Sequence, residues 1–143
     1  MKKMFLAVAI FASSIAFANP SLDKVIESRF KESFPKAEKV TWYESDTYYE
    51  VLFTNNQVKC RLWYDRNGNV TKTERYYGEE GLSPFLLARL NKKYTGKKVF
   101  GVTEISSDNG TAYYIILQDD RRWYHVSADE SGILRLDKKL LKA

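Results

Sequence analysis

Residues 49–68 have the sequence YEVLFTNNQVKCRLWYDRNG, and residues 113–132 repeat its pattern as YYIILQDDRRWYHVSADESG. Tyr49 and Gly68 at the two ends of the first stretch correspond to Tyr113 and Gly132, so the offset is 64 residues at both ends. A constant offset leaves no room for an insertion or a deletion between them. The pattern therefore predicts two copies of one strand–turn–strand–turn unit.

A segment with helical periodicity precedes each copy, because its apolar residues recur at spacings of three and four. The first stripe consists of Leu22, Val25, Ile26, Phe30 and Phe34, and the second of Leu86, Leu87, Leu90 and Tyr94. Ser21 and Ser83 are suitable N-cap residues, and Pro84 fits the first helical position. Strand-like segments follow each helix, at residues 40–43, 48–54, 58–64 and 69–75 and again at residues 99–105, 112–118, 122–128 and 132–137.

These elements predict an α+β fold, a tandem repeat of a helix plus a four-stranded antiparallel meander, with the helices packed on one sheet face. The repeats span about residues 20–77 and 82–140, and together they form a single domain over residues 19–143.

The first residues predict a signal peptide, residues 1–18. Lys2 and Lys3 precede an apolar run that is too short for a membrane span, and Ala16 and Ala18 form a small-x-small cleavage site. We therefore expect cleavage after Ala18, a periplasmic or secreted location and no membrane insertion after cleavage; an uncleaved N-terminal anchor is the alternative. Cleavage lowers the formal net charge from +5 to +3, and no basic run stands out, so nucleic acid is not an expected partner.

The alternation of strand residues assigns their side chains to two faces. The more uniformly apolar set is expected to form the core: Tyr49, Val51, Phe53, Cys60, Leu62 and Tyr64, with Tyr113, Ile115, Leu117, Tyr124, Val126 and Ala128. The opposite set mixes large aromatic and charged side chains, as the centres of protein interfaces do. Its candidate partner-binding residues are Tyr48, Arg61, Trp63, Tyr114, Trp123 and His125. The alternative is that these aromatic side chains pack against one another or are buried between the two halves.

No catalytic motif, metal site or cofactor site is predicted. His125 is the only histidine, which excludes a site with two histidines, and it has no neighbouring nucleophile pattern. Asp65 and Asp129 open segments similar to the start of a calcium loop, but they lie between strands, so we interpret both segments as turns. Cys60 is the only cysteine, which excludes an internal disulfide. It is either a buried apolar residue, as free cysteines often are, or a thiol that pairs with a partner chain.

Several motifs together resemble a known family: residues 40–42 (VTW), 49–53 (YEVLF), 64–68 (YDRNG) and 82–84 (LSP) at the start of a helix. They are similar to the PepSY-like family of small exported bacterial proteins, also described as like the beta-lactamase inhibitory protein (BLIP). The resemblance implies tandem copies of a helix-plus-sheet module, an exported location and no known catalysis. It also implies a curved sheet that embraces a partner protein.

The sequence thus leads to three hypotheses about function. The first is an exported, non-enzymatic binding module for a protein or peptide. The second is an inhibitor of a peptidase or another enzyme, of the type found among BLIP-like proteins. The third is an enzyme of unrecognised type, which would need a deep polar pocket around His125.

Overall fold

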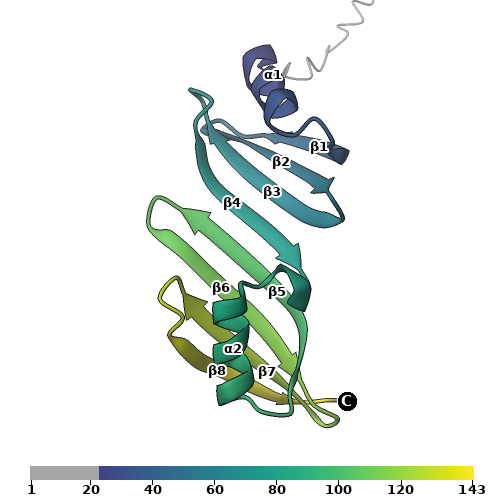
Figure 1. The fold of residues 1–143 in the computed structure, drawn as a ribbon. Coiled ribbons are helices and arrows are strands. Elements are labelled where there is room, and N and C mark those ends of the chain that lie inside the picture. Colours follow the sequence, from purple (N-terminus) through teal and green to yellow (C-terminus); the bar gives the residue numbers. More distant parts are fainter. Residues whose placement is uncertain (1–22) are drawn as a thin grey trace, which may run out of the picture.

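The computed structural model describes residues 23–143 (Figure 1). The predicted signal peptide, its cleavage site after Ala18 and the predicted cap Ser21 lie outside the described residues. The elements in chain order are α1 (Lys24–Ser33), β1 (Glu38–Glu44), β2 (Tyr48–Asn55), β3 (Val58–Asp65), β4 (Val70–Tyr77), a 3-10 helix η1 (Glu79–Gly81), α2 (Pro84–Lys93), β5 (Lys98–Ser107), β6 (Gly110–Gln118), β7 (Arg122–Asp129) and β8 (Leu134–Leu141).

The sheet corrects the predicted fold class. All eight strands belong to one antiparallel sheet in the order β1-β2-β3-β4-β5-β6-β7-β8, and β4 pairs with β5 from Lys72–Ser107 to Tyr77–Val102. The predicted tandem repeat of a helix plus a four-stranded meander is therefore wrong, because the chain is mainly one eight-stranded sheet with two short α-helices. Two separate meanders would have left unpaired backbone groups along both β4 and β5, and pairing these strands satisfies them.

The two α-helices begin at residues that cap their free backbone N–H groups. The helix that the sequence predicts from Ser21 begins at Lys24 instead, where Asp23 Oδ1 accepts a hydrogen bond of 2.8 Å from the Val25 amide. The predicted start of the second helix is confirmed: Ser83 Oγ accepts from the Leu86 amide at 3.2 Å, and Pro84 is the first helical residue.

Side chains of the helices and strands form two separate buried clusters. The α1 cluster contains Ile26, Phe30, Tyr49, Val51, Phe53, Leu62 and Tyr64. The α2 cluster contains Tyr77, Leu82, Leu86, Leu90, Val102, Ile115, Leu117, Tyr124, Val126 and Ala128. All the strand residues predicted for the core are thus buried except Cys60 and Tyr113, which are half-buried.

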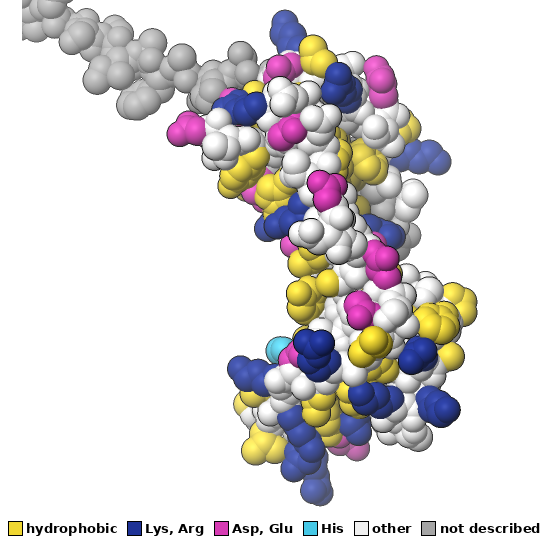
Figure 2. All heavy atoms as spheres, turned by 90° about the vertical axis from the view of Figure 1, so that its left-hand side faces the viewer, with side chains coloured by type: hydrophobic (Ala, Val, Ile, Leu, Met, Phe, Trp, Pro, Cys, Tyr) yellow, Lys and Arg dark blue, Asp and Glu magenta, His cyan; other side chains and the backbone are white. Residues whose placement is uncertain are grey.

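Both clusters lie on the same face of the sheet, which we call the helix-side face. Leu62 pairs with Thr73, and Tyr77, four residues farther along β4, pairs with Val102. Cross-strand partners and residues an even number of positions apart share a face. The opposite face, which carries Trp63 and His125, we call the open face. Figure 2 shows a molecule that is broad at its two ends and narrower in the middle.

Two glycine turns bring the sheet close to the helices. Gly68 follows β3 with φ 83°, and Gly132 follows β7 with φ 76°, a region that favours glycine. A Cβ atom on Gly68 would lie 2.9 Å from Arg29 Nη1 of α1, and one on Gly132 would lie 2.8 Å from Phe85 Cε1 of α2. Each glycine therefore permits both the turn and the close approach of a helix.

Candidate binding face

The six candidate residues named from the sequence share the open face, but they do not form one cluster. Tyr48 lies on β2, Arg61 and Trp63 on β3, Tyr114 on β6, and Trp123 and His125 on β7. Tyr48 and Tyr114 are 39% and 48% exposed, and the other four are half-buried. Adjacent strands lie about 4.8 Å apart, so the residues on β3 and β7 are separated by roughly 19 Å. Their role in binding remains a prediction.

The first group on this face is built around Trp63. Lys72, its cross-strand partner on β4, places Nζ 3.6 Å from the centre of the indole ring. Arg61 lies 5.5 Å from the same centre, and its Nε is 3.1 Å from Glu50 Oε1 on β2. Cations at such distances are attracted to the face of an indole ring. Trp63 is therefore held in place while part of it stays accessible.

The second group is built around Trp123. The Phe100 ring meets it edge-on, with the ring centres 4.9 Å apart, and Lys142 Nζ lies 4.6 Å from the indole centre. Lys142 Nζ also donates a hydrogen bond of 2.9 Å to Gln118 Oε1, the side chain of the cross-strand partner of Trp123. This group repeats the combination of a half-buried tryptophan and a nearby lysine at the other end of the face.

His125 lies between an apolar and a basic side chain on the open face. Its cross-strand neighbours are Ile116 on β6 and Lys138 on β8. Among residues 23–143, its ring makes no hydrogen bond to another side chain or to the backbone. A histidine placed this way can take part in a contact surface, but it lacks the partner that would orient it as a general base.

Sequence reasoning missed four residues of the open face: Tyr43, Lys72, Tyr76 and Phe100. The alternation of β1 and β4 was a sufficient signal for the first three. Phe100 follows no alternation, because the register shifts between Val99 and Gly101 and leaves an extra residue in β5. Such bulges redirect a side chain in a way that a regular period does not predict. More than half of Phe100 is exposed.

A polar group on the helix-side face separates the two buried clusters. Glu104 on β5 pairs with Arg75 on β4, with Arg75 Nη1 3.3 Å from Glu104 Oε1. Tyr77 Oη donates a hydrogen bond of 2.5 Å to Glu104 Oε2. Burial and the negative charge of Glu104 raise the pKa of Tyr77. The arrangement ties β4 to β5 at the junction of the two halves of the sheet.

Cys60 lies beside this junction, opposite Arg75. It is half-buried, and its Sγ lies 3.6 Å from the Val58 carbonyl oxygen. Burial raises the pKa of the thiol, although Arg75 acts in the opposite direction. The reactive thiolate is therefore disfavoured at neutral pH.

The Asp-containing turns use their carboxylates internally, which confirms their interpretation as turns. Asp65 Oδ1 accepts hydrogen bonds of 2.9 Å from the amides of Asn67 and Asn69, and Asp129 Oδ1 accepts one of 2.9 Å from the Ser131 amide. Within residues 23–143, no three His, Cys, Asp or Glu side chains gather as a metal site would require.

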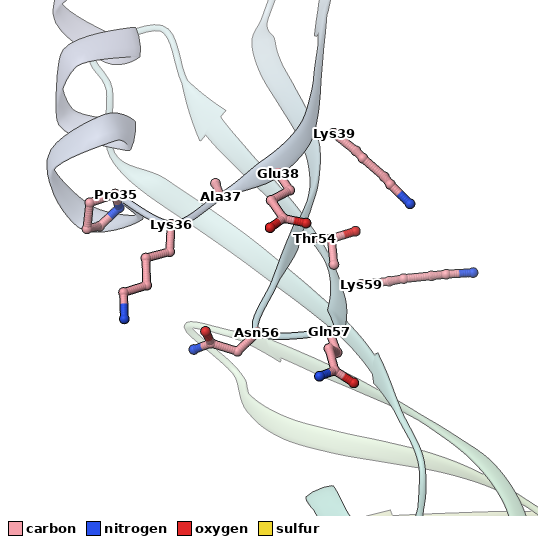
Figure 3. A pocket seen from close by; sticks show the side chains of 9 residues that line it. All are labelled: Pro35, Lys36, Ala37, Glu38, Lys39, Thr54, Asn56, Gln57 and Lys59. Carbon is pink, nitrogen blue, oxygen red and sulfur yellow. The ribbon is translucent and has the colours of Figure 1, made fainter.

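A hollow of about 850 Å³ lies away from the open-face tryptophans, at the turn between β2 and β3 (Figure 3). The turn residues Asn56 and Gln57 both have positive φ, 49° and 68°, as tight hairpin turns require. Lys36 extends to one side of the hollow, and Lys39 and Lys59 extend to the other. The side chains do not converge on a common point, so this hollow lacks the arrangement of a small-molecule site.

Comparison with known proteins shows likeness of fold. A BLIP-like protein from Bacteroides fragilis has 19% sequence identity and a TM-score of 0.62, over 85% of this chain and 88% of its own. A DUF2874 family protein from Bacteroides ovatus has 24% identity and a TM-score of 0.58, over 81% and 84%. A Bacteroides eggerthii protein that is provisionally assigned to the periplasm has 13% identity and a TM-score of 0.59, over 83% and 88%.

No family model matches the chain, and no curated protein matches it. The likeness supports the BLIP-like part of the resemblance drawn from the sequence, and it does not support PepSY specifically. Neither α-helix within residues 23–143 is long and apolar enough to cross a membrane. Because these identities are low, what the structural neighbours establish is the fold: this chain folds like BLIP-like and DUF2874 proteins.

Proposed function

We propose that this chain is an exported, non-enzymatic binding module that uses the open face to bind a protein or peptide. The observation that carries the proposal is the partial exposure of Trp63 and Trp123 and the way in which neighbouring side chains hold them. Each is half-buried and held by neighbouring side chains, yet neither is covered by a helix. Tryptophan is prominent among the residues that dominate binding energy, and a side chain that is already fixed loses little entropy on binding.

The surroundings of the tryptophans also support a protein partner. Tyr48 and Tyr114 add exposed aromatic surface. The ion pair of Arg61 with Glu50 adds two half-buried charged groups of opposite sign. Aromatic residues and arginine are enriched at the centres of protein interfaces. The proposed export rests on the predicted signal peptide, residues 1–18.

Site-specific photo-crosslinking in the native cell envelope tests the proposal. A photoreactive residue in place of Tyr48 or Tyr114 is expected to capture a partner. The matched controls replace Val25 on α1 and Phe85 on α2, which are 58% and 54% exposed. Capture from both helix positions, without capture from the open face, would refute the proposal.

The tryptophans provide the second arm of the experiment. The double substitution Trp63→Ala and Trp123→Ala is expected to abolish crosslinking from Tyr48, because hot-spot residues cost about 2 kcal/mol or more of binding free energy when truncated. Circular dichroism at the crosslinking temperature controls for folding. Unchanged crosslinking by a folded double variant would contradict the assigned role of these side chains.

A second candidate function is inhibition of a peptidase or another enzyme, which is favoured by the likeness of fold to the BLIP-like protein from Bacteroides fragilis. Addition of the purified chain to envelope peptidases, and separately to a beta-lactamase, tests this function. Inhibition predicts a dose-dependent loss of rate that the double tryptophan variant does not produce. Unchanged rates at every dose would refute inhibition of these enzymes and would not affect the proposed binding function.

A further inference from the structure

The outer side of β8 is an open edge of the sheet. β8 is the last strand in the order, so among residues 23–143 only β7 pairs with it. All its residues after Leu134 are exposed. The backbone N–H and C=O groups along such an edge can pair with another extended chain.

Positive charge is concentrated along this edge. β8 carries Arg135, Lys138 and Lys139 against a single carboxylate, Asp137, and that carboxylate accepts a hydrogen bond of 3.1 Å from Ser127 Oγ. None of the three cations makes an ion pair within the described part of the chain. They are therefore available to a partner with negative charge.

The last turns of α2 extend the positive surface. Arg89, Lys92 and Lys93 line a hollow of about 690 Å³ with the residues that lead into β8, and Lys93 Nζ donates a hydrogen bond of 2.7 Å to the Leu134 carbonyl oxygen. α2 contains no acidic residue. Figure 2 shows several Lys and Arg side chains at the end of the molecule that carries α2 and β8.

The placement of the cations favours a strand over a flat surface. Lys138 pairs with His125 on the open face, whereas Lys139 pairs with Tyr124 on the helix-side face, 5.4 Å from the centre of its ring. A membrane surface would not meet cations on both faces of a sheet at once. An added strand would meet cations on both faces, because its own side chains alternate between the two faces.

A second copy of this chain is a poor occupant. Two β8 strands side by side would bring together six cations and only two carboxylates, and this excess of positive charge opposes their pairing. The other edge, β1, suits an added strand less well. The register of β1 against β2 shifts between Glu38 and Thr41, and the register of β8 against β7 also shifts once, at Asp137. Only the shift in β1 contains a residue with positive φ, Lys39 at 54°, so the edge of β1 is the more distorted of the two.

We propose that β8 is a docking edge for an extended, acidic segment of a partner protein, which adds to the sheet as a ninth strand. Backbone hydrogen bonds supply pairing, and Arg135, Lys138 and Lys139 select for acidic side chains. The inference goes beyond the binding role of the open face and depends on different residues, so either proposal can fail without the other.

The test uses a synthetic peptide of the same length as β8 in which pairs of Glu alternate with pairs of Val, so that an added strand has Glu side chains on both faces. Binding is followed by amide NMR. We expect the β8 amides to shift and their hydrogen exchange to slow. Lys138→Glu with Lys139→Glu is expected to weaken binding about tenfold or more, since opposed like charges cost several kcal/mol. The matched control, Lys36→Glu with Lys59→Glu, changes the net charge equally at the other end of the molecule and is expected to bind normally.

Three further outcomes would overturn the proposal. One is equal binding of an acidic peptide with Pro in place of Val, because proline cannot donate backbone hydrogen bonds. Another is self-association through β8 in the absence of peptide. The third is binding to vesicles of phosphatidylcholine and phosphatidylglycerol that depends on Lys138 and Lys139, without binding of the Glu–Val peptide. The double tryptophan variant is expected to bind this peptide as the parent chain does.

Discussion

Glu104 joins the two halves of the sheet, and the substitution Glu104→Ala tests whether the eight strands unfold as one unit. The carboxylate on β5 accepts a hydrogen bond of 2.5 Å from Tyr77 Oη and lies 3.3 Å from Arg75 Nη1, and both partners are on β4. The alanine variant therefore loses two side-chain contacts across the central strand pair.

The expected loss of stability follows from the burial of the two partners. Tyr77 is only 5% exposed, so its hydroxyl loses a charged acceptor with little access to water, at a cost of about 1.5 to 3 kcal/mol. The Arg75 side chain is 45% exposed, and its ion pair adds no more than about 0.5 kcal/mol. We expect Glu104→Ala to lower the free energy of unfolding by about 2 to 3 kcal/mol. Glu104→Gln keeps an acceptor and is expected to cost about 1 kcal/mol.

Urea unfolding, followed by tryptophan fluorescence and by far-UV circular dichroism, measures these changes. One cooperative sheet predicts a single transition that moves to lower urea by the same amount with both probes. Glu74→Ala on β4 is the matched control, because Glu74 lies on the open face and makes no ion pair within residues 23–143. A Glu104→Ala variant as stable as the Glu74→Ala variant would refute the reasoning. Separate transitions for the two probes would show that the sheet does not unfold as one unit.

The remaining predictions concern pH, a turn and the core. Asp119 accepts a hydrogen bond from Tyr124 Oη, which with nearby amides lowers the pKa of the carboxyl to about 2. NMR titration is expected to find a pKa of about 2 for Asp119 in the parent chain and a higher pKa in Tyr124→Phe. The stabilising effect of ionised Asp119 is present above about pH 4 and is lost as the pH falls toward 2. Gly132→Ala is expected to destabilise the chain more than Gly96→Ala in urea unfolding. Both glycines have positive φ, but only an added Cβ at Gly132 meets other atoms within 4 Å; equal losses would contradict the close approach of α2. Ile115→Ala is expected to cost about 2 to 5 kcal/mol of unfolding free energy, because Ile115 is fully buried and the substitution leaves a cavity; a loss below about 1 kcal/mol would contradict its place in the core.

Alkaline pH gives an independent check on the Glu104 junction. Because burial and Glu104 raise the pKa of Tyr77, the neutral phenol is the form that stabilises the fold. This stabilisation is fully present below the ordinary tyrosine pKa near 10 and is lost as the pH rises above it. Urea unfolding is therefore expected to show a steeper alkaline loss of stability in the parent chain than in Tyr77→Phe. Equal slopes would mean that the Tyr77 hydroxyl has no special environment.

The face of a strand residue was predictable wherever the strand is regular, because alternation is a local property of an extended chain. Val51 and Ile115 are fully buried, and Tyr48 and Tyr114 are exposed on the other face, as their positions predicted. Phe100 was not predictable, since the bulge that turns it toward Trp123 depends on how β5 pairs with β6. The division into repeats over residues 20–77 and 82–140 stays a prediction.

The sequence by itself determined the order of the helical and extended segments and which strand side chains avoid water, because both properties follow from the spacing of residues close together in the chain. It did not determine their bounds: the last strand, predicted at residues 132–137, is β8 at Leu134–Leu141. Only the tertiary structure decided that β4 and β5 pair, which made the predicted fold class wrong. Sheet pairing is made by backbone groups that nearly every residue carries, so the side-chain pattern of a strand is the same at an edge and inside a sheet. For the same reason, the structure alone shows that β8 is left open and that its cations lie along a free edge.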